Sequence, residues 1–100
     1  MSSVLELGNL RLDVQSLKVS INDHWIDLTL LEMRLLGFLL RAFPQMISRA
    51  EVIRKIWGNE PVKPGTINTH LTNLRPKIER WNYQIKTRED NVFVQPKARY

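Results

Sequence analysis

Short runs of alternating apolar and polar residues occupy the first 28 positions of the chain. An alternation with a period of two is typical of half-buried β-strands. The runs cover residues 4–7, 10–14, 18–21 and 25–28, and turn-forming residues separate them. The pattern therefore predicts a four-stranded antiparallel sheet over residues 4–28, with its apolar face packed on the rest of the protein.

After residue 28 the apolar spacing changes to that of helices. Thr29 with Glu32, and Ser48 with Glu51, match the Ser/Thr-x-x-Glu capping box. In this box the hydroxyl accepts a bond from a free backbone N–H and the carboxylate accepts another in return. Apolar residues follow both starts at intervals of three and four, which indicates one buried face on each helix. Gly58 is placed to end the second helix with a positive φ.

A third helix is expected from about residue 66 to residue 81, and Pro76 inside it predicts a kink or a local weakening. The alternating pattern then returns over residues 85–94, which predicts a β-hairpin. Three helices followed by a hairpin are typical of the winged helix-turn-helix, so together with the four leading strands they predict an α+β winged helix-turn-helix fold. We expect one domain over residues 1–100, with a three-helix core over residues 29–81 and a wing hairpin over residues 85–94.

The polar face of the predicted third helix carries no formal charge between residues 66 and 74. It consists of short side chains that donate and accept hydrogen bonds, namely Thr66, Asn68, Thr69, His70, Thr72 and Asn73. Threonine and asparagine are poor helix formers, so their concentration on one helix calls for a reason other than helix stability. A face of this kind favours base reading in a DNA groove over the alternative of an ordinary solvated surface.

Charge is distributed unevenly along the chain. Residues 1–62 contain seven basic and seven acidic side chains, whereas residues 63–100 contain eight basic and three acidic ones. The whole net charge of +5 therefore lies in the segment that holds the polar helix. This asymmetry favours a polyanionic partner over a basic tail kept for solubility.

The composition argues against several other classes of protein. The chain has no cysteine, so disulfides and thiolate metal sites are excluded, and a cytoplasmic location is expected. Residues 28–43 form the most apolar run, which contains charges and is too short to span a bilayer, so we expect no membrane association. His24 and His70 have no further metal ligands at suitable spacing. We therefore expect no catalytic residues, no cofactor and no metal.

The three tryptophans, Trp25, Trp57 and Trp81, lie far apart in the sequence. A platform on which bases stack needs aromatic side chains that are clustered and exposed. The spacing instead predicts that each tryptophan anchors part of the apolar core.

An ordered set of residues runs through the three predicted helices. It comprises Leu28-Thr29 with Glu32 and Leu35-Leu36, then Pro44, Arg49, Ile53 and Ile56-Trp57-Gly58, and then Thr66-Ile67, His70-Leu71, Leu74-Arg75 and Lys77. In this order the residues closely resemble the OmpR/PhoB family of response-regulator effector domains, and the resemblance extends to the four leading strands. It implies DNA-binding transcriptional regulation within a two-component system. The family's receiver domain is missing from these 100 residues, so we expect an isolated effector module.

The resemblance also implies a role for individual residues. The third helix would enter the major groove of duplex DNA, with Thr66 near a phosphate at its start, where free N–H groups favour anions. The expected DNA-binding residues are Thr66, Thr69, His70, Thr72, Asn73, Arg75, Lys77, Arg80 and Arg88. The resemblance further implies a loop that contacts RNA polymerase or DNA, comprising Asn59, Glu60, Val62 and Lys63 and ending at Pro64. Members of the family typically bind tandem DNA half-sites as homodimers.

The wing departs from the family pattern. Residues 90–93 replace the family's usual Gly-x-Gly-Tyr, and Glu89 stands where an arginine often enters the minor groove. An alternative therefore remains, in which the domain has lost DNA binding and contacts another protein through the loop of residues 60–64. RNA binding is less favoured, because the major groove of an A-form helix does not admit a helix.

Overall fold

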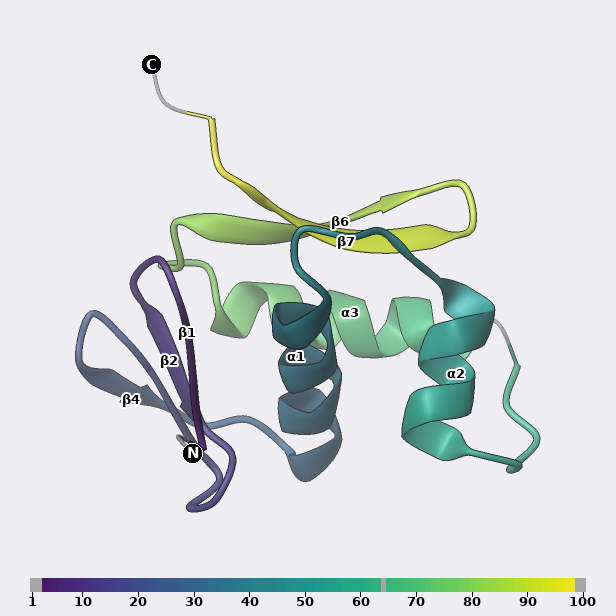
Figure 1. Ribbon diagram of the computed structural model, residues 1–100, viewed down its shortest axis with the longest axis horizontal. Coiled ribbons are helices and arrows are strands. Elements are labelled where there is room, and N and C mark those ends of the chain that lie inside the picture. The colour runs from purple at the N-terminus through teal and green to yellow at the C-terminus, as the bar shows by residue number, and fades with distance from the viewer. Residues whose placement is uncertain (1–2, 64, 99–100) are drawn as a thin grey trace.

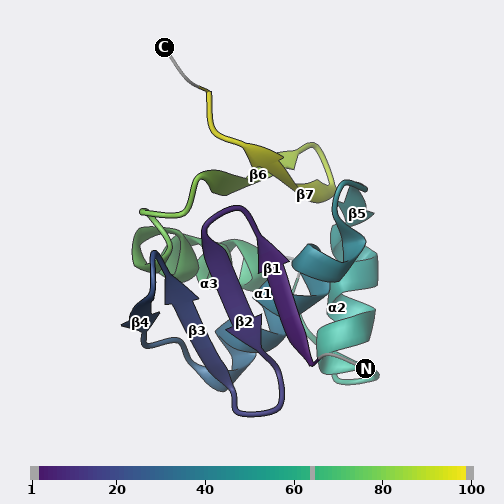
Figure 2. The same ribbon diagram turned by 60° about the vertical axis from the view of Figure 1, so that its left-hand side comes forward.

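The computed structural model describes residues 3–63 and 65–98. Its first four strands are β1 (Val4–Leu7), β2 (Leu10–Asp13), β3 (Lys18–Ile21) and β4 (His24–Ile26). They form one antiparallel sheet in the order β1-β2-β3-β4, which Figure 2 shows from its open side. The predicted N-terminal sheet is therefore confirmed. Pro64 of the predicted loop and Arg99 of the basic segment lie outside the described residues.

The sheet packs on the helices because its apolar residues alternate. Leu10 and Leu12 are buried while Arg11 between them is exposed. The β1–β2 turn is also attached to the segment that follows the third helix. Trp81 Nε1 donates to the carbonyl oxygen of Leu7 at 2.8 Å, and Asn9 Nδ2 donates to the carbonyl oxygen of Arg80 at 2.8 Å. These contacts fix the sheet relative to the end of the third helix.

Gly8 lies in this β1–β2 turn and has a φ of +60°. A Cβ atom at this position would lie 2.0 Å from Oδ1 of Asn82. Glycine is therefore required here both by the backbone conformation and by the close approach of the neighbouring segment.

The three helices are α1 (Leu30–Ala42), α2 (Arg49–Trp57) and α3 (Gly65–Lys77). Thr29 caps α1 with both reciprocal hydrogen bonds of the capping box, as predicted. Ser48 caps α2 by accepting from the backbone N–H of Glu51 at 3.1 Å. The prediction of a full second box is wrong, because the Glu51 carboxylate instead accepts from Arg54 at 3.0 Å. Gly58 ends α2 with a φ of 65°, as predicted.

The third helix ends at Lys77, four residues earlier than its predicted end at residue 81. Pro76 lies in the last turn and cannot donate a hydrogen bond to the carbonyl group of Thr72. The backbone N–H of Ile78 instead bonds to the carbonyl group of Arg75 at 3.2 Å, and the chain turns. Pro76 therefore lies one residue before the end of α3, and the helix does not continue past Lys77.

The hairpin belongs to a second sheet that the sequence predicted only in part. Strands β6 (Tyr83–Arg88) and β7 (Asn91–Pro96) are longer than predicted and are joined by Glu89 and Asp90. A third strand, β5 (Ile47–Ser48), pairs with β7 and gives the order β5-β7-β6. This two-residue strand carries no periodic signal, so its pairing could not be read from the sequence. Figure 1 shows the hairpin lying across one end of α1 and alongside α3.

The core lies where the N-terminal sheet, the helices and the hairpin meet. Trp81 is fully buried there, and Trp57 is half-buried. The prediction that Trp25 anchors the core is wrong, because 71% of its surface is exposed. Its neighbours in β4 pair with β3, but its ring lies outside, 5.4 Å from Nζ of Lys18. Among residues 3–63 and 65–98, no helix is long and apolar enough to cross a membrane.

Candidate nucleic-acid interface

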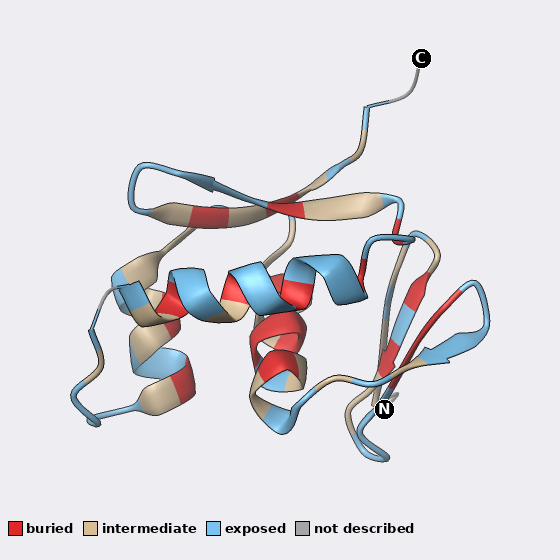
Figure 3. Cartoon of the chain, turned by 180° about the vertical axis from the view of Figure 1, so that it is seen from behind, coloured by how far each residue is buried: buried red, intermediate tan, exposed pale blue. Residues whose placement is uncertain are grey.

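The outer face of α3 is open to solvent. Thr69, Thr72 and Asn73 are exposed, and Figure 3 shows this helix with its exposed turns toward the viewer. The opposite face holds Ile67 and Leu71, and neither side chain has any exposed surface. The helical spacing of the apolar residues thus turns the short polar side chains outward, where no other part of the described structure covers them.

His70 and Thr66 lie at the margin of this face and are half-buried. The ring of His70 lies 5.5 Å from that of Trp57, with an angle of 36° between the planes. The last residue of α2 therefore supports the side of α3 on which His70 lies. The backbone N–H of Thr66 donates to the carbonyl oxygen of Lys63 at 2.9 Å, which connects the loop to the start of the helix.

Arg75 links α3 to the first strand of the wing. Its Nε donates to the carbonyl oxygen of Ile85 at 3.2 Å, while the residue as a whole remains exposed. A guanidinium group has five N–H donors, so one bond leaves the others available to an acceptor outside the protein. Arg75 can therefore position the wing and still contact a ligand.

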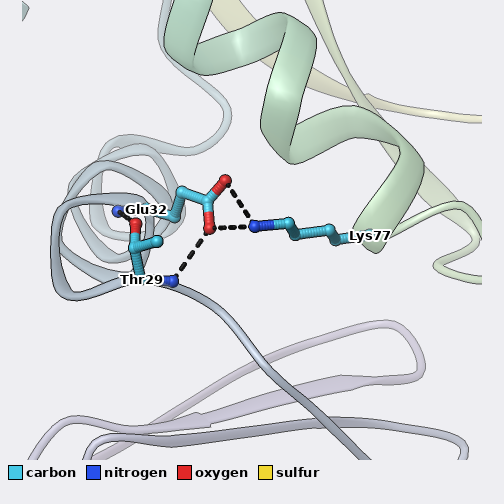
Figure 4. A network of polar contacts seen from close by, with 3 residues as sticks. All are labelled: Thr29, Glu32 and Lys77. Atoms are coloured by element: carbon cyan, nitrogen blue, oxygen red, sulfur yellow. Dashed lines mark hydrogen bonds and ion pairs between the residues drawn. The ribbon is translucent and has the colours of Figure 1, made fainter.

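Lys77 lies in a different environment from the other predicted cations. Its Nζ donates to both carboxylate oxygens of Glu32 on α1, at 2.8 and 3.1 Å (Figure 4). Glu32 is only 3% exposed and also accepts from the backbone N–H of Thr29 at 2.8 Å. The ammonium group thus neutralises a buried carboxylate and attaches the end of α3 to the start of α1. The predicted role of Lys77 as a phosphate contact does not fit this placement.

Opposing effects act on the pKa of Glu32. Burial raises the pKa, but the hydrogen bonds from Lys77 and Thr29, together with the positive charge of Lys77, lower it below its ordinary value of 4.5. The carboxylate is therefore charged at neutral pH, and the α1–α3 ion pair is present in full.

Arg49 connects three elements, although no role was predicted for it. Its Nη1 donates to the carbonyl oxygen of Glu89 in the wing turn, and its Nη2 donates to Oδ1 of Asn68 on α3 at 3.1 Å. Its backbone N–H donates to the carbonyl oxygen of Asp90 at 2.7 Å. The side chain is 17% exposed, and its Nε is buried with no partner. Arg49 therefore sets the position of the wing relative to α3. Its place among the residues that resemble the OmpR/PhoB family was the sequence signal that could have identified it.

The remaining predicted cations are exposed. Arg88 ends β6, and Arg80 lies in the turn after α3. Lys86 is also exposed and stands two residues before Arg88, so both point to the same side of the strand. Glu89 has a φ of 55° and lies in the turn, not in a strand. Basic side chains thus flank α3 beyond its C-terminal end and along the wing.

The loop between α2 and α3 projects away from the hairpin (Figure 1). Asn59, Glu60 and Lys63 are exposed, and Val62 is half-buried. The described part of the chain holds no group of three histidine, cysteine or acidic residues that could bind a metal ion.

Residues 22–91 match the family model described as "Transcriptional regulatory protein, C terminal". The chain belongs to this family. Its members are DNA-binding domains of transcription factors and not enzymes, and the predicted OmpR/PhoB-type effector domain is confirmed.

Curated relatives include the sensory transduction protein RegX3 of Mycobacterium leprae, which is 40% identical over 77 residues. The alignment covers 76% of this chain and 39% of RegX3. The chain therefore spans about two fifths of the length of that relative.

Two solved structures support the winged helix-turn-helix fold. One is the response regulator DrrB of Thermotoga maritima, an OmpR/PhoB homologue, with a TM-score of 0.80, 25% identity and coverage of 91% of this chain and 43% of DrrB. The other is the DNA-binding domain of CpxR from Escherichia coli, with a TM-score of 0.78, 26% identity and coverage of 89% and 91%. The predicted fold class is thus confirmed.

Proposed function

We propose that this chain binds duplex DNA in a sequence-specific manner as the effector domain of a response regulator, with α3 in the major groove. In this proposal the sheet of residues 4–28, the helices within residues 29–81 and the wing around residues 85–94 act as one domain. The observation that carries it is the uncharged, exposed face of α3, because short donors and acceptors can approach base edges closely.

The proposed base-reading residues are Thr69, Thr72 and Asn73, together with the free N–H groups of Arg75. His70 lies beside them, and Thr66 stands at the start of the helix, where the backbone favours a phosphate. Arg80 and Arg88 would contact the DNA backbone on either side. Lys77 is not included, because its ammonium group forms an ion pair with Glu32. The likeness of the fold to the DNA-binding domain of CpxR supports DNA binding by the domain as a whole.

Further partners follow from the family resemblance. We propose that the loop with Asn59, Glu60, Val62 and Lys63 contacts RNA polymerase, since the loop itself projects away from the wing and most of these residues are exposed. We also propose that two copies bind tandem half-sites as a homodimer on DNA, in the cytoplasm.

Selection of bound duplexes from a random pool, followed by sequencing, tests the proposal. We expect an enriched motif, bound more than about a thousandfold more tightly than random duplexes. With about five phosphate contacts, log K should fall with log [salt] with a slope of about −4 to −5. A direct repeat with half-sites about one helical turn apart would support the tandem dimer, and an inverted repeat would contradict it. Failure to enrich any motif would contradict sequence-specific binding.

The acidic wing turn favours a second candidate, a protein-interaction domain that has lost DNA binding. Glu89 and Asp90 are both exposed at the tip of the hairpin, and DNA phosphates would repel them. Titration with random genomic duplexes at low ionic strength distinguishes the two candidates. Salt-sensitive binding supports the DNA-binding domain, and its absence supports the protein-interaction domain.

A further inference from the structure

An apolar groove lies along α1, and the proposed DNA contacts do not include it. The groove has a volume of about 360 Å³ and runs between α1, the C-terminal turn of α2 and the turn that joins β2 to β3. Its apolar lining includes Leu12, Leu17, Met33 and Phe38. Leu17 is 49% exposed and Phe38 is half-buried, so apolar surface is accessible to a partner.

Three basic side chains line the same groove, namely Arg34 and Arg41 of α1 and Lys55 of α2. All three are exposed, and none forms an ion pair within residues 3–63 and 65–98. The adjacent Arg54, in contrast, pairs with Glu51 at 3.0 Å and does not line the groove. The groove therefore combines an apolar floor with cations that have no countercharge in the domain.

The position of the groove keeps it separate from α3. Glu32 points from α1 toward Lys77 on α3, and an α-helix turns by about 100° per residue. Arg34 and Arg41 are therefore about 180–200° around the helix from Glu32. Figure 1 shows α1 and α2 in front of α3, and Figure 3 shows α3 from the opposite side. A ligand in the groove would not compete with DNA on α3.

We propose that this groove binds an acidic amphipathic helix of a protein partner while α3 is bound to DNA. Leucine-type side chains of the partner would cover Met33 and Phe38, and its carboxylates would pair with the three cations. Arg34 and Arg41 are seven residues apart, about 10 Å along the axis of α1, which matches carboxylates separated by two turns of a second helix. Apolar anchors along one helical face, inserted in a groove, are a common mode of peptide recognition.

The test uses a fluorescein-labelled synthetic peptide with leucines on one helical face and glutamates beside them. Its counterpart carries lysine in place of every glutamate. Fluorescence anisotropy is measured with the 100-residue chain before and after saturation with an unlabelled duplex. We expect the glutamate peptide to bind equally well in both cases, and the lysine peptide, tested without duplex because it would bind DNA itself, not to bind. Displacement of the peptide by the duplex, or equal binding of both peptides, would overturn the proposal.

A pair of matched variants locates the site. The double variant Arg34→Gln/Arg41→Gln should weaken peptide binding by about five- to tenfold, as expected for the loss of two exposed charge pairs. Its affinity for random duplex should stay within about twofold, because both arginines lie on the side of α1 opposite to Glu32, which contacts α3. The control Arg80→Gln/Arg88→Gln removes the same charge and should weaken duplex binding only. Peptide binding that follows the control pair, and not the groove pair, would contradict the assignment.

Amide chemical shifts provide an independent measurement. Titration of the glutamate peptide into the 15N-labelled chain should perturb the amides of Leu17, Gly37 and Phe38 and leave those of Thr69 and Thr72 unchanged. Shifts centred on α3 would show that the peptide merely replaces DNA on the basic surface, and would overturn the proposal. If DNA binding itself fails, these shifts still decide whether the groove binds the peptide.

Discussion

Helix α3 and the β6–β7 wing lie next to each other but expose different side chains. The open face of α3 presents threonine and asparagine, whereas the wing presents Lys86 and Arg88, followed by Glu89 and Asp90. Short neutral side chains suit the base edges of a groove, and cations suit the phosphates beside it. Under the proposed function, separate elements of this domain would therefore carry out sequence reading and electrostatic attraction.

Two arginines connect these elements. Arg49 holds the wing turn and Asn68 of α3 at once, and Arg75 of α3 donates to the backbone of β6. The two regions can therefore differ in chemistry and still approach one duplex as a rigid unit. Substitutions that break this connection should have larger effects than those that change one region alone.

The largest effect is expected for Arg49→Ala. The substitution removes the hydrogen bonds to Glu89 and Asn68 from a mostly buried guanidinium, so the free energy of unfolding should fall by about 2–4 kcal/mol. Urea denaturation followed by tryptophan fluorescence measures the change. The control Arg54→Ala removes an exposed pair with Glu51 and should cost less than about 0.5 kcal/mol. Equal effects of the two substitutions would show that Arg49 does not connect the wing to α3.

Asn73→Ala tests the reading function of α3. Binding to the selected site should weaken by roughly 1–3 kcal/mol, with little change for unrelated duplexes, because one base contact is lost. Fluorescence anisotropy with matched and scrambled duplexes measures both. Gln15→Ala removes an amide from the β2–β3 turn and should change neither affinity. Unaltered binding of the Asn73 variant to its site would refute the base-reading role of this residue.

Lys77→Met tests the contact that holds α3 on α1. Glu32 would lose its countercharge, so the free energy of unfolding should fall by about 1–3 kcal/mol at pH 7. The expected loss is smaller than for a fully buried ion pair because the Lys77 side chain is 39% exposed and solvent screens its charge. The pKa of Glu32 is lowered in the folded protein, so its stabilising contribution is fully present above the ordinary value of 4.5 and is lost as the pH falls below 4.5 and through the lower pKa of the folded state. Denaturation at several pH values should therefore show the two proteins converging below pH 4.5. A constant difference across this range would contradict the ion-pair explanation.

The smallest effect is expected for Arg88→Gln in the wing. Removing one phosphate contact should reduce the magnitude of the salt slope by about one unit and weaken binding to all duplexes alike. Titrations at several salt concentrations measure the slope. Lys18→Gln in the N-terminal sheet serves as the control and should leave it unchanged. A loss of affinity confined to one sequence would mean that the wing also reads bases, and the separation of roles would fail.

Local signals predicted much of the fold. The α1 capping box, the strands of residues 4–28 and the glycine that ends α2 each depend on a few neighbouring residues. Predictions that depended on distant residues were less accurate. Trp25 was expected in the core because of the spacing of the three tryptophans, but it lies on edge strand β4 and faces solvent.

In the candidate site, too, features that depend on neighbouring residues were predicted and contacts between distant residues were not. Helical spacing alone indicated that Thr69, Thr72 and Asn73 share the outer face of α3, because a period of 3.6 residues determines which side chains lie opposite Ile67 and Leu71. The partners of Lys77 and Arg49 could not be predicted. Lys77 pairs with a residue 45 positions earlier, and Arg49 contacts a carbonyl group 40 positions later.

The sequence by itself determined the class of elements, their order, the uncharged face of α3 and the basic C-terminal segment, since each of these follows from residue type and short-range spacing. Only the tertiary structure decided which cations remain free for a partner and which are held inside the protein. A charge is neutralised by whichever opposite charge folding brings within a few ångströms, and that distance depends on how the helices pack.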